Sequence, residues 1–333
     1  MSFDVILPFL RPIAHLLLDE GVTEIMVNGS GRIFVEREGR LERAHGLTLP
    51  EANLRVAVRN LARVLGDEVS EERPILDARL PDGSRVAALL PPVSLGGTTL
   101  TIRKFQNRRF TADELVRIGT LTADALRVIR DAIDARHNLL ISGGTGTGKT
   151  TLLNALAAWL PAIDRIVLIE DTAELQLEAE NLARFEARRD QPGLPAITVR
   201  DLVRASLRHR PDRIVIGEVR GGEAFDLLQA LNTGHSGTLS TIHANSADQA
   251  LTRFASCVLQ SGVDVPYAAI RHSIADSIHC VVHLERCGAQ RIVREIIRLQ
   301  RYDAAADRYI VETVTAQHPL RPPAGSVRAW LRA

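Results

Sequence analysis

Cysteine is scarce in this chain, and the spacing of the three cysteines suits neither disulfide bonds nor a common metal site. Cys257, Cys280 and Cys287 show no C-x-x-C spacing, and their number is odd. A disulfide framework needs pairs, and a four-thiolate zinc site needs four cysteines, so neither is indicated. We expect three small buried hydrophobes. His279 and His283 stand nearby, but on a strand both would lie on the face opposite to Cys280, which argues against a metal site.

Long apolar runs and an excess of one charge are also missing. No uninterrupted apolar stretch approaches membrane-spanning length, and Pro8 and Pro12 interrupt an N-terminal segment that has no basic residues ahead of its apolar ones. We therefore expect a cytoplasmic protein. The 41 Lys and Arg nearly balance the 40 Asp and Glu, and no stretch interleaves basic and aromatic residues. The composition thus argues against a protein that wraps nucleic acid.

The length and rhythm of the sequence predict two domains. With 333 residues and 45% hydrophobic content, the chain can build two cores. Residues 1–104 alternate short strands with two helical patterns, residues 105–112 form a polar linker, and residues 113–333 follow the strand–helix rhythm of an α/β nucleotide-binding sheet. The expected fold class is α/β.

The expected elements of the first domain are an amphipathic segment at 3–20, strands at 24–28, 32–37, 75–80, 85–90 and 98–105, and a helix at 51–65. The second domain should begin with helices in 112–136. Its expected strands are 138–142, 165–170, 213–217, 238–242 and 277–284. Its later helices fall near 198–209, 221–232, 246–260 and 266–276, and 291–300 with 308–315 should form a hairpin.

The segment Gly143–Thr150 carries the strongest functional signal. It fits G-x-x-x-x-G-K-[ST] in full, between an apolar strand and a helix. Glycines are needed because the backbone wraps closely around a di- or triphosphate with its N–H groups pointing inward. Lys149 would reach the β- and γ-phosphates, and Thr150 would ligate Mg²⁺. The predicted nucleotide-binding residues are Gly143, Gly144, Thr145, Gly146, Thr147, Gly148, Lys149, Thr150 and Thr151.

Acidic residues end two of the predicted strands. The apolar run 213–217 terminates in Glu218, as in a Walker B element, and Glu218 would hold the attacking water or an Mg²⁺-bound water. Its alternative role is to cap the next helix. Three acids in 169–174 would repel one another without a nearby cation. We expect Glu170 to act on a metal-bound water or as a second polarising group, and Glu174 to be a solvated loop acid.

A histidine ends a third strand. His243 follows the predicted strand 238–242, where it would contact the γ-phosphate and report its loss. The alternative is a histidine that caps the next helix or satisfies a hydrogen bond in the core. Because the carboxyl ends of the strands in an open α/β sheet meet at one edge, these motifs should converge.

Four elements in this order resemble the type II/type IV secretion ATPase superfamily. They look like its Walker A, Asp box, Walker B and His box, at Gly143–Thr150, Ile169–Glu174, Ile216–Arg220 and Gly234–Ser246. The similarity covers nearly the whole chain, because segments 22–29, 80–86 and 100–105 resemble the N-terminal domain of CpaF-type Tad pilus ATPases and TrbB-type conjugative-transfer ATPases. The sequence leaves the choice between these two branches open.

The resemblance implies a RecA-like P-loop NTPase C-terminal domain, a smaller α+β (PAS-like) N-terminal domain, and a homohexameric ring with ATP and Mg²⁺ between the domains. It implies that Arg85 and Arg103 reach the phosphates from the N-terminal domain. The expected function is ATP hydrolysis that powers inner-membrane type IV secretion, conjugative transfer or Tad pilus assembly. The protein would associate peripherally with inner-membrane platform proteins, and nucleic acid would be involved only indirectly, as a transported substrate.

Other interpretations stay open beside this one. The chain would instead be a nucleotide-gated assembly scaffold with negligible hydrolysis, or a RecA-type DNA motor, against which the balanced charge argues. Arg200, Arg204 and Arg208 lie four apart, which is typical of a solvated helix face. In a ring, Arg208 and Arg210 would be candidates to meet acidic residues of the adjacent subunit.

Overall fold

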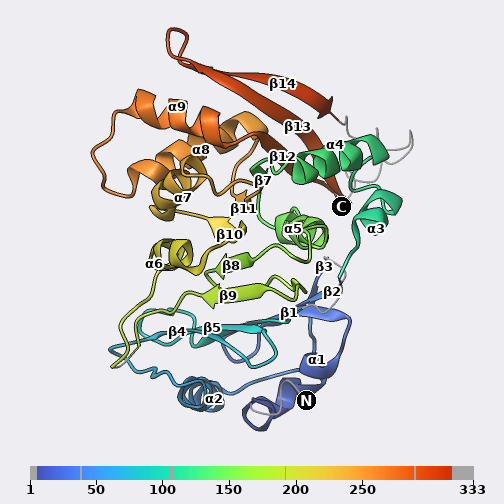
Figure 1. Ribbon diagram of the computed structural model, residues 1–333. Helices are drawn as coiled ribbons and strands as arrows, with labels where there is room; N and C mark the ends of the chain where they lie inside the picture. The colour runs from blue at the N-terminus through green and yellow to red at the C-terminus, as the bar shows by residue number, and fades with distance from the viewer. Residues whose placement is uncertain (1–5, 38–39, 106–108, 192, 289, 317–333) are drawn as a thin grey trace. The chain divides into compact units, whose positions relative to one another are not determined.

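A computed structural model gives the structure of the chain and describes residues 6–37, 40–105, 109–191, 193–288 and 290–316 (Figure 1). The start of the predicted amphipathic segment, the linker residues 106–108 and the predicted domain end at 317–333 lie outside the described residues. The chain forms two compact units. The first comprises Met1–Arg108, Thr172–Glu174 and Arg188–Ile197, and the second comprises Arg109–Asp171, Leu175–Ala187 and Thr198–Ala333.

The first unit contains a six-stranded antiparallel sheet in the order β3-β2-β1-β6-β5-β4. Burial alternates along its strands: Val86 and Ala88 point into the core, as do Leu100 and Ile102 on the neighbouring strand. The segments after Asn28 and Leu80 each join antiparallel partners. The strands are β1 (Val22–Asn28), β2 (Ile33–Arg37), β3 (Arg40–Arg43), β4 (Ile75–Arg79), β5 (Arg85–Leu89) and β6 (Thr99–Arg103).

Helix α2 (Glu51–Val64) covers this sheet with Leu54, Val58 and Leu61, which are fully buried. The predicted N-terminal amphipathic segment is broken into shorter pieces, because Pro8 and Pro12 each sit in the first turn of a 3₁₀-helix. The pieces are η1 (Leu7–Phe9), η2 (Arg11–Ile13) and α1 (Ala14–Leu18).

The second unit contains an eight-stranded sheet in the order β14-β13-β12-β7-β11-β10-β8-β9. The strands from β12 to β9 run parallel, and the hairpin β13–β14 pairs antiparallel at one edge, as predicted for the tail. Strands β7 and β8 are buried at every position, because helices cover both faces. The strands are β7 (Leu139–Gly143), β8 (Ile166–Glu170), β9 (Leu182–Glu186), β10 (Arg213–Val219), β11 (Leu239–Ile242), β12 (Cys280–Cys287), β13 (Gln290–Asp303) and β14 (Arg308–Ala316).

Helices α3 to α5 pack on one face of this sheet and α6 to α9 on the other (Figure 1). Threonine caps begin three of them: Thr111, Thr122 and Thr198 each accept a backbone N–H. No helix in the described part of the chain is both long and apolar enough to cross a membrane. The helices are α3 (Ala112–Arg117), α4 (Ala123–Asp134), α5 (Lys149–Ala157), α6 (Val199–Ser206), η3 (Leu207–His209), α7 (Glu223–Asn232), α8 (Ala247–Leu259) and α9 (Tyr267–Ser277).

The structure differs from the sequence predictions in several elements. Strands β3 and β9 were not predicted, since neither shows a clear apolar pattern; β3 is exposed at every position. The predicted strand start at Ser277 is wrong, because α9 extends to Ser277 and β12 begins at Cys280. Cys257 and Cys280 are buried as expected, and burial raises the pKa of the Cys280 thiol to about 12, but Cys287 is only half-buried.

The hairpin β13–β14 is fixed to α9 by one buried cation. Arg271 of α9 is 7% exposed, and its guanidinium carbon lies 4.2 Å from the ring centre of Tyr309 and 4.8 Å from that of Tyr302. Within α9 itself, Nη1 of Arg271 donates a hydrogen bond to the hydroxyl oxygen of Tyr267 at 3.2 Å. The arginine thus joins elements that are distant in the sequence.

Candidate functional site

The loop between β7 and α5 has the shape that a phosphate-binding loop requires. Gly148, the N-cap of α5, has φ +93° and no side chain, so the first N–H groups of the helix are open to an anion. A Cβ on Gly143 would lie 2.5 Å from Oγ1 of Thr147 and 2.6 Å from the carbonyl oxygen of Leu284. Glycine is therefore required where the loop leaves the strand.

Lys149 folds back over this loop. Its Nζ donates to the carbonyl oxygens of Gly143 at 3.0 Å and Gly144 at 2.9 Å. Burial lowers the pKa of Lys149, while the negative charge of Glu218 acts in the opposite direction. The ammonium group is thus held at the mouth of the loop, next to the acidic end of β10.

Strand β10 carries Glu218 to that point. Oε2 of Glu218 accepts from Nε of Arg220 at 2.7 Å, and Nη1 of Arg220 also donates to Oδ2 of Asp171 at 3.0 Å. Oε1 lies 2.7 Å from Nε2 of His243, but no hydrogen bond joins these two atoms. Within the described residues, Oε1 is a buried oxygen without a hydrogen-bond partner, which is costly unless a ligand or water supplies one.

His243 follows β11 and stands between the lysine and the glutamate. Its ring nitrogens lie 3.4 and 3.5 Å from Nζ of Lys149. Burial is the main cause that lowers the pKa of His243; Glu218 opposes the shift, and Lys149, Arg220 and Arg253 add to it. These surroundings favour the neutral form of the imidazole.

Glu170, at the end of β8, has different surroundings. Its side chain is buried, and Oε1 accepts from the backbone N–H of Leu175 at 2.8 Å. Nη2 of Arg184 lies 3.7 Å from Oε2. The side chain also passes close to Gly217, where an added Cβ would lie 3.1 Å from Cγ of Glu170. Glu170 thus packs against the residue that precedes Glu218.

The structure brings together the predicted loop, Glu218, Glu170 and His243 at the carboxyl edge of one parallel sheet. Arg85 and Arg103 belong to the first unit, where they are direct cross-strand partners on β5 and β6. Within that unit, Nη2 of Arg85 lies 2.8 Å from Oε1 of Glu174, so the expectation of a merely solvated Glu174 is wrong.

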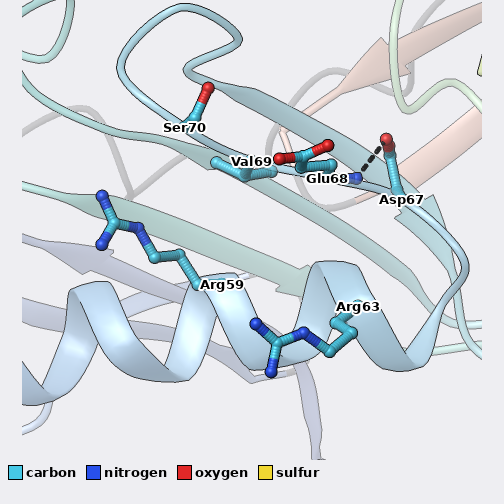
Figure 2. A pocket seen from close by; sticks show the side chains of 6 residues that line it. All are labelled: Arg59, Arg63, Asp67, Glu68, Val69 and Ser70. Carbon is cyan, nitrogen blue, oxygen red and sulfur yellow. Dashed lines mark hydrogen bonds between the residues drawn. The ribbon is translucent and has the colours of Figure 1, made fainter. Parts of the chain in front are cut away.

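Two hollows lie in different units. A hollow of about 490 Å³ in the first unit is lined by Arg59 and Arg63 of α2 and by the loop 67–70 (Figure 2). It is the larger, but it contains none of the predicted site residues. A hollow of about 390 Å³ in the second unit is lined by Gly144, Thr145, His243, Ala244, Asn245, Gln249 and Arg253. We take the smaller one as the site, because it adjoins the phosphate-binding loop.

Three arginines near the loop were missed by the sequence reading. Arg220 holds Glu218, and its place two residues after the Walker B glutamate could have indicated it. Arg291 donates from Nε to the carbonyl oxygen of Gly146 at 2.9 Å, and its Cδ lies 3.3 Å from where a Cβ on Gly148 would be. Arg253 lines the hollow from α8. Nothing in the local sequence marks Arg291 or Arg253.

The arginine series Arg200, Arg204 and Arg208, on α6 and η3, is only in part a solvated face. Nε of Arg200 and Nε of Arg204 both bind Asp226 of α7, at 2.6 and 2.7 Å, so these two residues fix one helix to the next. Arg208 and Arg210 are exposed. Their role at a subunit contact stays a prediction.

The two histidines near Cys280 have partners of their own. Nδ1 of His279 accepts from the backbone N–H of Asn138 at 3.1 Å, and Nδ1 of His283 lies 2.9 Å from Oγ of Ser142. The first contact joins the residues just before β7 and β12, and the second joins the two strands themselves. The described residues contain no group of three or more His, Cys, Asp or Glu placed to hold a metal ion.

Comparison with known proteins agrees with this geometry. The family of type II/IV secretion system proteins matches residues 10–320. The chain belongs to this family. The conjugal transfer protein TrbB of Rhizobium radiobacter is 39% identical over 288 residues, 85% of each chain. The type IV secretion system protein PtlH of Bordetella pertussis is 36% identical over 303 residues, covering 84% of this chain and 89% of PtlH.

A solved structure shows the same fold. The X-ray structure of the Legionella pneumophila ATPase DotB superposes with a TM-score of 0.57 at 19% identity, covering 93% of this chain and 80% of that one. The predicted class, with an N-terminal α+β domain and a RecA-like C-terminal ATPase domain, is confirmed. Membership of this secretion ATPase family supports an ATPase and implies nucleotide binding.

Proposed function

We propose that this secretion ATPase hydrolyses ATP as a homohexamer and powers conjugative transfer or a related type IV secretion machine at the inner membrane. The single observation that carries the proposal is the cluster of Lys149, His243 and Glu218 beside an open helix N-terminus. A phosphate chain needs a cation such as Lys149 beside it, and an attacking water needs an acceptor such as Glu218. The rest of the proposal draws on the relatives, two of which are named for conjugal transfer or type IV secretion.

The residues of the site divide the chemistry among them. The N–H groups of the loop and α5 would bind the β-phosphate, and Lys149 would neutralise charge on the β- and γ-phosphates. Glu218 would orient the attacking water with Oε1, the oxygen without a partner in the described structure. Neutral His243, between the two, would contact the γ-phosphate and change its contacts when that group leaves. Glu170 would act as a second polarising group through its contact with Gly217.

The donor set fits Mg²⁺ that is held mainly by the nucleotide. Magnesium keeps several waters and takes one or two protein ligands beside phosphate oxygens, so it needs no cluster of protein carboxylates. The described residues offer no such cluster, whereas the unpartnered oxygen of Glu218 suits a metal-bound water. Thr150 would ligate the ion, with Glu218 acting through water. When bound, the ion would offset charge that develops on the phosphates.

Arg85 and Arg103 give the first unit a role in the cycle. They are paired across β5 and β6, and Nε of Arg85 is a buried donor without a hydrogen-bond partner among the described residues. Guanidinium groups bind phosphate oxygens with paired hydrogen bonds. We assign them to the phosphates of ATP, so that binding closes one domain on the other and phosphate release reopens it. Inner-membrane platform proteins would receive this motion on the cytoplasmic side.

The decisive experiment measures phosphate release by the purified chain with Mg²⁺-ATP. Wild type should turn over ATP without added DNA, and Lys149→Gln should abolish turnover. If the wild type binds ATP but does not turn it over, the protein is a nucleotide-gated scaffold instead. Turnover that requires DNA would indicate a DNA motor. Light scattering with ATP tests the oligomer, and a monomer alone would contradict the hexameric ring.

A further inference from the structure

One side of the hollow at the phosphate-binding loop is formed by α8, which plays no part in the motifs above. The loop contributes Gly144 and Thr145, and the segment after β11 contributes His243 to Asn245. Gln249 and Arg253 complete the lining. Gly144 and Thr145 belong to the loop that surrounds a phosphate chain in this motif. The α8 side chains that line the hollow would therefore face the terminal phosphate of a bound nucleotide.

Helix α8 presents a polar face to this hollow by its own periodicity. Gln249 and Arg253 are four residues apart and therefore lie on the same side of the helix. Both are exposed, while Ala250, Leu251 and Phe254 are buried in the core of the unit. The packing of the apolar face thus fixes which way the arginine points.

Arg253 differs from Arg220, which lies at the same end of the sheet. Arg220 is occupied by two carboxylates, Glu218 and Asp171. In the described part of the chain, Arg253 has no carboxylate within ion-pair distance, and its Nη2 makes only a long contact of 3.5 Å to the carbonyl oxygen of Arg220. A guanidinium keeps its charge at any physiological pH. Arg253 is therefore the permanently charged side chain of the lining, and it is available to an anion.

Resting on the proposed binding of ATP, we infer that Arg253 binds the outermost phosphate of the nucleotide from within the same subunit. The ligand class is a nucleoside triphosphate whose γ-phosphate enters the hollow between α8 and the loop. Arg253 would neutralise one of its oxygens opposite Lys149, and ADP, which lacks this group, would leave Arg253 free. The role is distinct from that proposed for Arg85 and Arg103, which belong to the first unit.

The inference predicts discrimination between two nucleotides. Titration calorimetry with Mg²⁺ compares ADP with a non-hydrolysable ATP analogue in wild type, Arg253→Gln and Arg253→Lys. Arg253→Gln should lower the affinity for the ATP analogue about tenfold or more, as expected for the loss of one charge-assisted contact. The affinity for ADP should stay within about twofold of the wild-type value. Arg253→Lys should recover part of the lost affinity, because lysine keeps the positive charge but lacks the paired N–H donors of the guanidinium group.

Arg301→Gln is the matched control, because Arg301 is exposed on β13 of the same unit and outside the hollow. It should bind both nucleotides as the wild type does. Equal affinity of Arg253→Gln and wild type for the analogue would overturn the inference, as would an equal loss for ADP. The assay is independent of hydrolysis: a wild type that binds the analogue but does not turn over ATP contradicts the proposed function and leaves the role of Arg253 intact.

Discussion

The ends of β8 and β10 are neighbours in one parallel sheet, yet the glutamates they carry are held in opposite ways. Glu170 is 3% exposed and accepts a backbone N–H from Leu175. Glu218 keeps one oxygen without a hydrogen-bond partner in the described structure, beside Lys149 and His243. The ends of two neighbouring strands thus carry one carboxylate whose hydrogen bond holds the fold and one with an oxygen that is available for chemistry. Four predictions test this contrast.

The largest effect is expected at Glu218. Glu218→Gln keeps the size of the side chain but removes the charge that would orient the attacking water. We expect turnover to fall about 10²- to 10⁴-fold, while ATP affinity stays within a few-fold. Phosphate-release kinetics and titration calorimetry measure the two quantities. Unchanged turnover would place the catalytic carboxylate elsewhere.

Glu170 should show the reverse pattern. Glu170→Ala leaves the buried N–H of Leu175 without its acceptor, so the free energy of unfolding should drop by about 1–3 kcal/mol. Turnover per folded molecule should fall less than about tenfold, because a polarising role through Gly217 is indirect. Urea unfolding followed by circular dichroism gives the stability, and Glu170→Gln, which keeps an acceptor, is the control. A larger loss of turnover than in Glu218→Gln would reverse the assignment.

Arg220 connects the two strand ends, since it binds Glu218 and Asp171 together. Removing it in Arg220→Gln should let the Glu218 side chain move and reduce turnover about tenfold, with a smaller effect on ADP binding. Steady-state kinetics check the expectation. Asp171→Asn weakens the same anchor from its other end and should act in the same direction but less. An increase in turnover in either variant would instead show that Arg220 restrains the glutamate.

The smallest effect is a pH dependence at His243. Its pKa in the folded protein lies below the ordinary value of 6.5, mainly through burial. Neutral His243 therefore contributes stability above pH 6.5 that is lost as the pH falls through the folded pKa. Between pH 7.5 and pH 5, the wild type should lose more unfolding free energy than His243→Gln. Equal losses would mean that His243 does not titrate differently in the folded and unfolded chain.

Much of the second unit could be predicted from the sequence, because its signals are local. The loop motif fixes a strand, a turn and a helix within a few residues, and the short strand-like runs before Glu218 and His243 mark parallel strands. The carboxyl-edge rule then brings them together without further information. The spacing accordingly predicted that Lys149 and Glu218 would lie at the same edge of the sheet.

What the sequence did not show depends on contacts between distant segments. Arg291 reaches the loop from β13, 145 residues after Gly146, and only the pairing of β12 with β7 brings it there. Glu170 and Glu218 differ in availability because the backbone N–H of Leu175 binds Glu170. No local sequence pattern indicates that contact. Strand β9 has a mixed burial pattern and is defined by its pairing with β8 rather than by its own periodicity.

The aromatic cluster around Arg271 has a practical consequence for spectroscopy. The chain has three tyrosines, and Tyr267, Tyr302 and Tyr309 all surround this one cation. Burial raises the pKa of the Tyr309 hydroxyl, and a hydrogen bond to Asp307 raises that of Tyr302. Tyrosine absorbance in alkaline solution therefore reports on a single place, the junction of the terminal hairpin with its helix. The protein carries its own optical probe of that junction, without a label.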